Sequence, residues 1–174
     1  MKNISFQTDV LPLKNQLFRL ALRITLNHAE AEDVVQETMM KVWNKRDDWN
    51  QIESIEAFCL TICRNLSLDK LRHNSFSQQL TENSQQPVEH ADNSYASNPE
   101  EQTIQRNRVE LVRQLISRLP EKQRTAMQLR DIEGKSYRDI AEIMGITEEQ
   151  VKVNIFRARQ TIKKQFKQQE EYGL

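Results

Sequence analysis

Residues 136–160 have the spacing of a helix-turn-helix, and this stretch constrains the fold more strongly than any other. Two short helices that cross closely need a small side chain at the crossing, which Ala141 supplies. Gly145 suits the turn, because a tight helix exit usually needs one residue at positive φ. We expect Val151 to seal the crossing from the second helix and Thr147 to cap that helix. The motif predicts a DNA-binding element.

The second helix of this motif separates an apolar stripe from a basic face. At a period of 3.6 residues, the stripe expected to face the core consists of Val151, Ile155, Ala158, Ile162 and Phe166. The opposite face holds Gln150, Val153, Arg157, Gln160 and Lys164. From Lys152 to Lys167 the helix carries six basic residues and no acid, which is typical of a phosphate-binding surface. Charge alone would equally fit an amphipathic helix with a solvated basic face.

The composition favours an all-α protein. The 174 residues include only three glycines and four prolines, whereas the helix formers Leu, Gln, Arg, Glu and Lys are plentiful. This length allows one or two domains, and a hydrophobic fraction of 37% is enough for two small helical cores.

A polar segment divides the chain into two parts. Residues 75–101 are rich in Ser, Gln and Asn, contain two prolines and no basic residue, and cannot bury a core. We therefore predict a helical domain over 1–74, a flexible acidic linker over 75–101 and a second helical domain over 102–174. The formal net charge is zero, but residues 103–174 hold fifteen basic and ten acidic side chains. Overall neutrality thus hides a basic module beside an acidic linker.

Helical periodicity predicts three helices before the linker and four after it. The first is marked by Leu13, Leu17, Leu20 and Ile24. Asn27 is expected to cap the second, with Glu30 in a capping-box relation, and the third is predicted from about Ser54 to His73. After the linker, one helix is expected over 102–118. Another is expected to have Pro120 at its first position, where a missing amide hydrogen costs nothing, before the helix-turn-helix.

The cysteines and the N-terminus give no sign of a cofactor or a membrane anchor. Cys59 and Cys63 are one helical turn apart, but zinc needs four ligands and the three histidines lack ligand spacing, so we interpret both thiols as buried hydrophobes. No cofactor is expected. The chain begins without an apolar signal region, and no window approaches the apolar length of a membrane span, so we expect a soluble cytoplasmic protein.

Three segments together carry a family resemblance: AEDVVQETMMKVW over 31–43, FCLTICRNLSLDKLR over 58–72, and a longer segment over 119–159 that ends in the helix-turn-helix. In this order, with a variable linker between the second and third, they resemble bacterial RNA polymerase sigma factors of the small two-domain extracytoplasmic-function (ECF) group. The resemblance implies a sigma factor that binds polymerase core and directs promoter-specific initiation, reading the -10 element with the second segment and the -35 element with the third.

The resemblance also implies partners and a polymerase-binding site. The family pattern D-x-x-Q-E falls on Asp33, Gln36 and Glu37, which would contact the β′ clamp of the polymerase core. The β subunit of the core is a second implied partner. The other implied partners are promoter DNA and an anti-sigma factor, and the anti-sigma factor is expected to cover these same three residues. No small-molecule substrate is implied.

For the -10 element, the resemblance implies contacts from residues of the third helix and of the loop before it. These residues are Trp49, Arg64, Asn65, Lys70 and Arg72. A captured flipped base needs a pocket and a stacking surface, and Trp49 or Trp43 could supply the surface. Either tryptophan could instead be core, and this alternative is stronger for Trp43.

For the -35 element, the resemblance implies base contacts from Val153, Phe156 and Arg157. Residues nearer the phosphates are Lys152, Asn154, Arg159 and Lys163. An exposed Val153 makes sense against a thymine methyl, and Arg157 can pair with guanine through two hydrogen bonds. Because serine and arginine are frequent in the family where this chain has Val153 and Asn154, the recognised sequence is left open.

The implied promoter geometry tests the predicted linker. The two elements lie about two DNA turns apart, roughly 70 Å. A relaxed linker of about 26 residues spans roughly 28 Å, and the same linker fully extended reaches roughly 85 Å. We therefore expect the polymerase surface to hold it stretched.

Two other classes of protein were considered. A helix-turn-helix regulator that binds an operator without acting as a sigma subunit needs neither D-x-x-Q-E nor the series Arg64, Asn65, Asp69 and Arg72. An enzyme is disfavoured, because the chain has no glycine-rich phosphate loop, no H-E-x-x-H and no nucleophile elbow.

Overall fold

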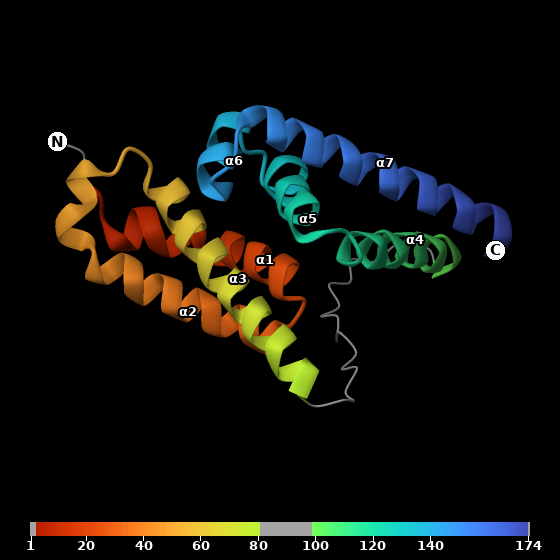
Figure 1. The fold of residues 1–174 in the computed structure, drawn as a ribbon, viewed down its shortest axis with the longest axis horizontal. Helices are drawn as coiled ribbons and strands as arrows, with labels where there is room; N and C mark the ends of the chain where they lie inside the picture. The colour runs from red at the N-terminus through yellow and green to blue at the C-terminus, as the bar shows by residue number, and fades with distance from the viewer. Residues whose placement is uncertain (1–2, 81–98, 174) are drawn as a thin grey trace.

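The computed structural model describes residues 3–80 and 99–173, and every secondary-structure element in these ranges is helical (Figure 1). The N-terminal domain comprises a π turn η1 (Phe6–Val10), 3-10 turns η2 (Leu11–Leu13) and η3 (Arg46–Gln51), and helices α1 (Lys14–Thr25), α2 (His28–Asn44) and α3 (Ile55–Leu80). The C-terminal domain comprises α4 (Pro99–Ser117), α5 (Glu121–Met127), a π turn η4 (Gln128–Ile132), α6 (Tyr137–Met144) and α7 (Glu148–Gly173). The prediction of an all-α chain with two small helical domains is confirmed.

Helices α1, α2 and α3 pack on one another around the periodic apolar residues of α1. Leu17, Leu20 and Ile24 are fully buried, as their spacing predicted. Helix α1 ends where Leu26 adopts a left-handed conformation, with φ at 56°, and its amide donates to the Leu22 carbonyl at 2.8 Å. This sharp exit turns the chain directly into α2.

The start of α2 is capped as predicted, but only in one direction. The Asn27 side chain accepts from the Glu30 amide at 3.0 Å. The Glu30 carboxylate does not return the bond; it accepts instead from the side-chain amide of Asn74 on α3. Glu30, in the first turn of α2, therefore ties α2 to α3.

Helix α3 is longer than predicted, and α4 begins earlier. Both extend into the predicted linker, since α3 ends at Leu80 and α4 starts at Pro99. The side chains of Ser75, Phe76 and Ser77 are exposed, so these three residues add nothing to the core. The rest of the predicted linker, residues 81–98, lies outside the described residues.

In the C-terminal domain, glycine and capping residues define the short helices. Pro120 precedes α5 as its N-cap, with φ of −52° and ψ of 143°, and not as its first helical residue. Gly134 and Gly145 have φ of 67° and 65°, which favours glycine. Ser136 caps α6 by accepting from the Asp139 amide at 3.1 Å. The helix-turn-helix thus has the turn conformation that its glycine predicted.

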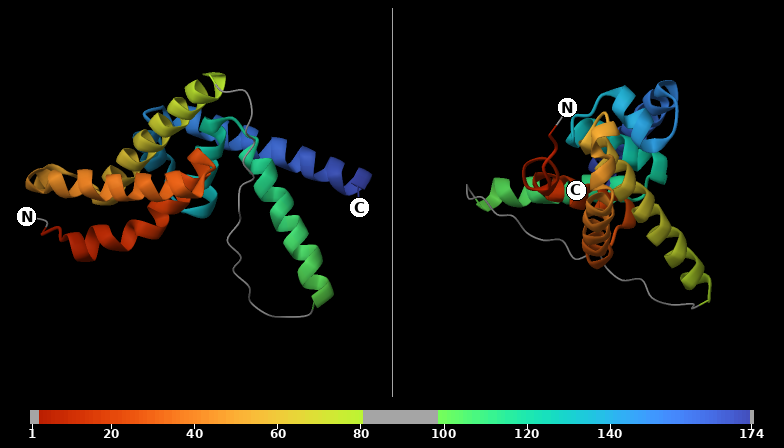
Figure 2. Two further views of the ribbon diagram at one scale, coloured as in Figure 1. Left: turned by 90° about the horizontal axis from the view of Figure 1, so that it is seen from below. Right: turned by 90° about the vertical axis from the view of Figure 1, so that its left-hand side faces the viewer.

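The two domains pack directly against each other. Figure 1 shows α5 and α6 lying between α7 and the N-terminal helices, with α1 against α5 and α3 against α6. One hydrophobic core runs through both domains and includes Leu60 and Cys63 on one side and Leu129, Ile140 and Met144 on the other. Figure 2 shows α4 and the C-terminal half of α7 extending away from the N-terminal domain. No helix in the described ranges has the length and apolarity needed to span a membrane.

Candidate functional surfaces

The D-x-x-Q-E residues of α2 lie on its outer side. Asp33 and Gln36 are exposed, and Glu37 is half-buried with its carboxylate 3.5 Å from the Lys41 ammonium. The inner side of the helix buries Val34, Val35, Thr38 and Val42. The three polar residues therefore take no part in the core and are available to a partner.

Two apolar residues continue this surface along α2. Met40 is 65% exposed and Trp43 47% exposed, and positions 36, 37, 40 and 43 share one side of the helix because they are three or four residues apart. The Trp43 ring contacts Phe6 edge-on and carries the Arg46 guanidinium 4.8 Å above it. We refer to this surface as the α2 face: Asp33, Gln36, Glu37, Met40 and Trp43.

Of the two tryptophans, Trp49 is buried and Trp43 is exposed, although the core was the stronger alternative for Trp43. Trp49 is only 6% exposed, and its indole N–H donates to the Val42 carbonyl at 3.1 Å. Its ring fills the core, which is the alternative left open for Trp49, so in this conformation it is not available to stack on a flipped base. Trp43, for which the core was the stronger alternative, is the accessible one. The indole nitrogen explains the difference, because burying Trp49 leaves no donor unpaired.

Three of the four -10 residues predicted on α3 are accessible. Asn65 and Arg72 are exposed and Lys70 is half-buried. Arg72 lies 3.8 Å from Asp69 in an ion pair whose side chains are mostly in solvent. Such a pair is weak in water and leaves the guanidinium free to exchange partners.

Arg64, the fourth, faces the C-terminal domain. It is 8% exposed, donates to the Met144 carbonyl at 3.3 Å and lies 3.8 Å from the Glu121 carboxylate. Burial lowers the pKa of its guanidinium, and the nearby Glu121 partly opposes that shift. Arg64 is therefore not accessible to DNA in this arrangement, because α5 and α6 cover it, and its contact with the -10 element stays a prediction.

The recognition helix begins with a reciprocal cap. The Thr147 hydroxyl accepts from the Gln150 amide at 3.1 Å, and the Gln150 side chain accepts from the Thr147 amide at 3.0 Å. The predicted cap is confirmed. The two bonds satisfy two backbone amides at the start of α7 and so stabilise its first turn.

The predicted core-facing stripe of α7 is confirmed for its first three residues, whereas Ile162 and Phe166 are only half-buried. Val151, Ile155 and Ala158 are buried, whereas Val153 and Phe156 are 44% and 63% exposed. Arg157, Lys152 and Lys163 are also exposed. Since large apolar side chains gain nothing from water, Val153 and Phe156 mark a surface that fits an apolar contact.

Several side chains around α7 already have partners within the domain. Arg159 makes a two-pronged ion pair with Asp131 of η4, which raises the pKa of its guanidinium through the hydrogen bond. Lys152 lies 5.4 Å from the centre of the Tyr137 ring, and Asn154 donates to the Gln150 carbonyl at 2.8 Å. Arg159 is therefore held against its own domain, which differs from its predicted phosphate contact.

The sequence did not predict one basic residue at this surface. A hollow of about 460 Å³ beside α7 is lined by Val153, Asn154 and Arg157 and also by Lys122 at the start of α5. Lys122 is exposed and lies outside the recognition helix. Only the packing of α5 on α7 brings it to this face, so helical periodicity within one segment carries no signal for it.

Comparisons with known proteins agree on one family. The profile of Sigma-70 region 2 matches residues 10–76, and that of Sigma-70, region 4 matches residues 110–162. The ECF RNA polymerase sigma factor EcfG of Rhodopseudomonas palustris is 31% identical over 157 residues, covering 89% of this chain and 81% of that protein. The RNA polymerase sigma-H factor of Pseudomonas aeruginosa is 28% identical over 164 residues, covering 92% of this chain and 85% of that protein.

A solved structure extends the likeness to the arrangement of the chain. The sigma factor RpoE from Bartonella quintana, in complex with the anti-sigma factor NepR, matches with a TM-score of 0.77 and 26% identity, over 93% of this chain and 96% of that one. The chain therefore belongs to the extracytoplasmic-function family of RNA polymerase sigma factors.

Proposed function

We propose that this sigma factor directs promoter-specific initiation through three separate surfaces. The α2 face binds polymerase core, α3 reads the -10 element over residues 64–72, and α7 reads the -35 element. The observation that carries the proposal is that each motif places exposed side chains on its own helix, outside the packing that forms the core. The operator-binding alternative leaves the exposed α2 face without a role.

At the α2 face, Asp33, Gln36 and Glu37 supply the polar contacts to the β′ clamp. The carboxylates of Asp33 and Glu37 and the carboxamide of Gln36 are accessible without unfolding any part of the helix. A solvated acidic surface also raises the rate of encounter with a basic partner.

At α7, Val153, Phe156 and Arg157 contact bases, and Lys152, Asn154 and Lys163 lie nearer the phosphates. Lys122 joins them from α5, because it lines the same hollow. Arg159 supports this surface indirectly by fixing η4 to α7 through Asp131. At the -10 element, Asn65, Lys70 and Arg72 are accessible as they stand, and Arg64 needs the domains to separate.

We further infer an anti-sigma factor as a partner, since the similar RpoE protein is in complex with one. The α2 face is the surface we expect it to cover, and a complex that still bound polymerase core would contradict this. The protein works in the cytoplasm together with polymerase and gives promoter choice to that enzyme with no catalytic step of its own.

The binding of polymerase core tests the assignment of the α2 face. The double substitution Asp33→Ala, Glu37→Ala is expected to reduce core affinity roughly a hundredfold, as for loss of two central polar contacts. A matched control replaces Asp47 and Asp48, two exposed acids of η3, with alanine and should leave affinity unchanged. Equal losses in both variants would mean that net charge, and not the α2 face, binds the core.

A further inference from the structure

The aromatic ring of Tyr137, the first residue of α6, lies against two cationic side chains. The Arg130 guanidinium of η4 is 4.5 Å from the centre of the ring, and the Lys152 ammonium of α7 is 5.4 Å from it. Both distances fall within the roughly 6 Å over which the face of an aromatic ring attracts a cation. One ring therefore links η4 to the first turns of the recognition helix.

The ring itself is held in place by its own domain. Tyr137 is half-buried and packs against the hydrophobic core. Arg130 donates to the Lys135 carbonyl at 2.8 Å, and Ser136 caps α6 by accepting from the Asp139 amide at 3.1 Å. These two bonds order the backbone on the N-terminal side of Tyr137, so the ring offers a fixed surface to the lysine of α7.

The side chain of Lys152 contacts the ring but pairs with no acid among the residues that the structure describes. It is exposed, and a lysine in solvent samples many rotamers. A partner that fixes such a side chain must overcome the loss of that freedom. A contact that orients the ammonium beforehand reduces this cost of binding.

An aromatic partner differs from an acidic one in what it leaves for DNA. Arg159, further along α7, is held by Asp131 through two hydrogen bonds, and that carboxylate neutralises its charge. The Tyr137 ring has no net charge, so the Lys152 ammonium is oriented and keeps its full attraction for an anion. Of these two cations, Lys152 is the one that stays available to a phosphate.

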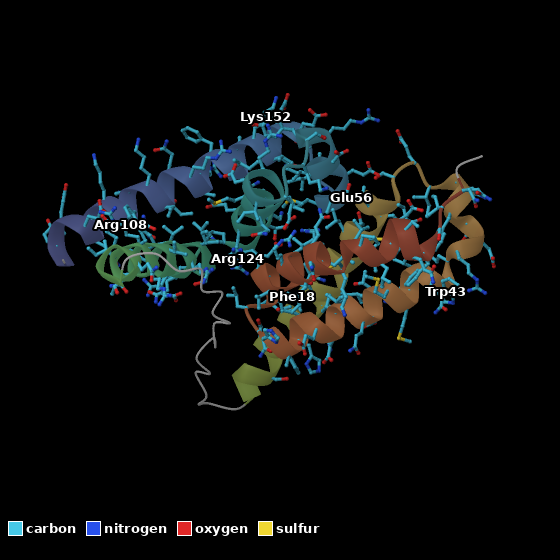
Figure 3. All side chains as sticks on the ribbon, turned by 180° about the vertical axis from the view of Figure 1, so that it is seen from behind. Phe18, Trp43, Glu56, Arg108, Arg124 and Lys152 are labelled. Atoms are coloured by element: carbon cyan, nitrogen blue, oxygen red, sulfur yellow. The ribbon has the colours of Figure 1, made fainter. Side chains whose placement is uncertain are left out.

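The position of Lys152 fits such a contact. Figure 3 shows it near the start of α7, on the side that faces away from the N-terminal domain. Its neighbour Val153 belongs to the exposed surface proposed to meet the -35 element. Phosphate contacts fix the register of a recognition helix on the duplex, while neighbouring side chains read the bases. Lys152 is thus placed for the first task and Val153 for the second.

We propose that Tyr137 is a positioning residue for DNA binding: the face of its ring orients the Lys152 ammonium towards a phosphate of the -35 element, and the Tyr137 hydroxyl plays no part. This inference rests on the proposed reading of the -35 element by α7. The contact between the ring and the ammonium in the free protein does not depend on that function.

Nuclear magnetic resonance of the free protein tests the contact itself. The current of an aromatic ring shifts protons held over its face upfield, so the ε-methylene protons of Lys152 should resonate upfield of their position in the variant Tyr137→Leu. Tyr137→Phe keeps the ring and should keep the shift. Identical Lys152 signals in the parent protein and in Tyr137→Leu would overturn the proposal.

A double-mutant cycle on DNA affinity tests the positioning. The full chain is titrated with a duplex that carries a -35 element, chosen from the promoter fragments of its own genome. Tyr137→Leu should weaken binding roughly threefold, and Tyr137→Phe should leave it unchanged. In a Lys152→Met background, which lacks the ammonium, Tyr137→Leu should cost nothing further. In the control background Lys167→Met, which removes an exposed lysine elsewhere on α7, Tyr137→Leu should again weaken binding roughly threefold.

The cycle separates failure of the positioning role from failure of the proposed function. An equal loss in Tyr137→Phe would assign the effect to the hydroxyl, and an equal loss with and without the Lys152 ammonium would assign it to the fold of the domain. Either result overturns the positioning role while the parent protein still binds the duplex. A parent protein that binds no duplex contradicts the proposed function, and the task of the ring at DNA falls with it.

Discussion

At the scale of single residues, the neighbours of each arginine decide what it does. Arg157 has an exposed side chain at the hollow beside α7, Arg159 is clamped to Asp131, and Arg124 is buried on helix-end carbonyls. All three have the same planar guanidinium, so the difference comes from the geometry and burial of each side chain. Only Arg157 keeps its hydrogen-bonding edge for DNA.

The contrast between Arg157 and Arg159 gives a paired prediction. Arg157→Ala should weaken binding to a -35 duplex by about 1–3 kcal/mol and relax the preference at one base pair. Arg159→Ala should leave base preference unchanged and cost under about 1 kcal/mol of unfolding free energy, because its pair with Asp131 is half in solvent. Competition binding against base-substituted duplexes and urea unfolding measure the two effects. A changed base preference in Arg159→Ala would contradict a purely structural role for the Arg159–Asp131 ion pair.

The buried thiols predict a loss of stability at alkaline pH. Burial raises the pKa of Cys59 and Cys63 from 9.0 to about 12, so the unfolded chain loses these protons first as pH rises. The free energy of unfolding should therefore hold below the unfolded pKa and fall as pH passes from there towards the folded value. Urea midpoints at successive alkaline pH values measure this, and Cys59→Ala should reduce the decline. A decline of the same size in that variant would assign it to other groups.

At the scale of single elements, α2 shows how one helix serves both core and partner. Its inner side buries valines. Its outer side carries acidic residues near Asp33 and, further along the helix, the exposed apolar pair Met40 and Trp43. Exposed apolar side chains beside polar ones are typical of a binding surface with an apolar centre.

Met40 tests this surface without disturbing the fold. Because its side chain is 65% exposed, Met40→Asp should leave the unfolding free energy nearly unchanged and lower the affinity for polymerase core roughly tenfold or more. Phe76→Asp is the matched control, since Phe76 is 66% exposed on α3 and lies off the α2 face. Core binding by calorimetry compares them, and an unaffected Met40→Asp variant would limit the interface to the polar residues.

Element boundaries could be predicted where a local interaction fixes them. Asn27, Gly145 and Thr147 define helix ends through short-range bonds that the sequence displays. The end of α3 was not predicted, because the exposed side chains of Ser75, Phe76 and Ser77 add no buried residue to its apolar stripe. The π turn η4, which follows α5 directly, was not predicted either.

At the scale of the whole molecule, the contacts between the two domains could not be predicted from the sequence. Glu56 and Lys135 are 79 positions apart, and neither their spacing nor their charge links them. The family resemblance describes residues in the form that acts at a promoter, so it predicted Arg64 at DNA, whereas the free chain packs it beneath α6. The exposure of Val153 and Arg157 on α7 was predicted better because it follows from one helix alone.

The most direct test of the central claim is in vitro transcription with purified polymerase core, with and without this protein, on a pool of promoter fragments from its own genome. We expect specific transcripts only when the protein is present, and their loss with Asp33→Ala, Glu37→Ala. Absence of both transcripts and core binding, together with tight operator binding by the protein alone, would contradict the account and assign the helix-turn-helix to an ordinary regulator.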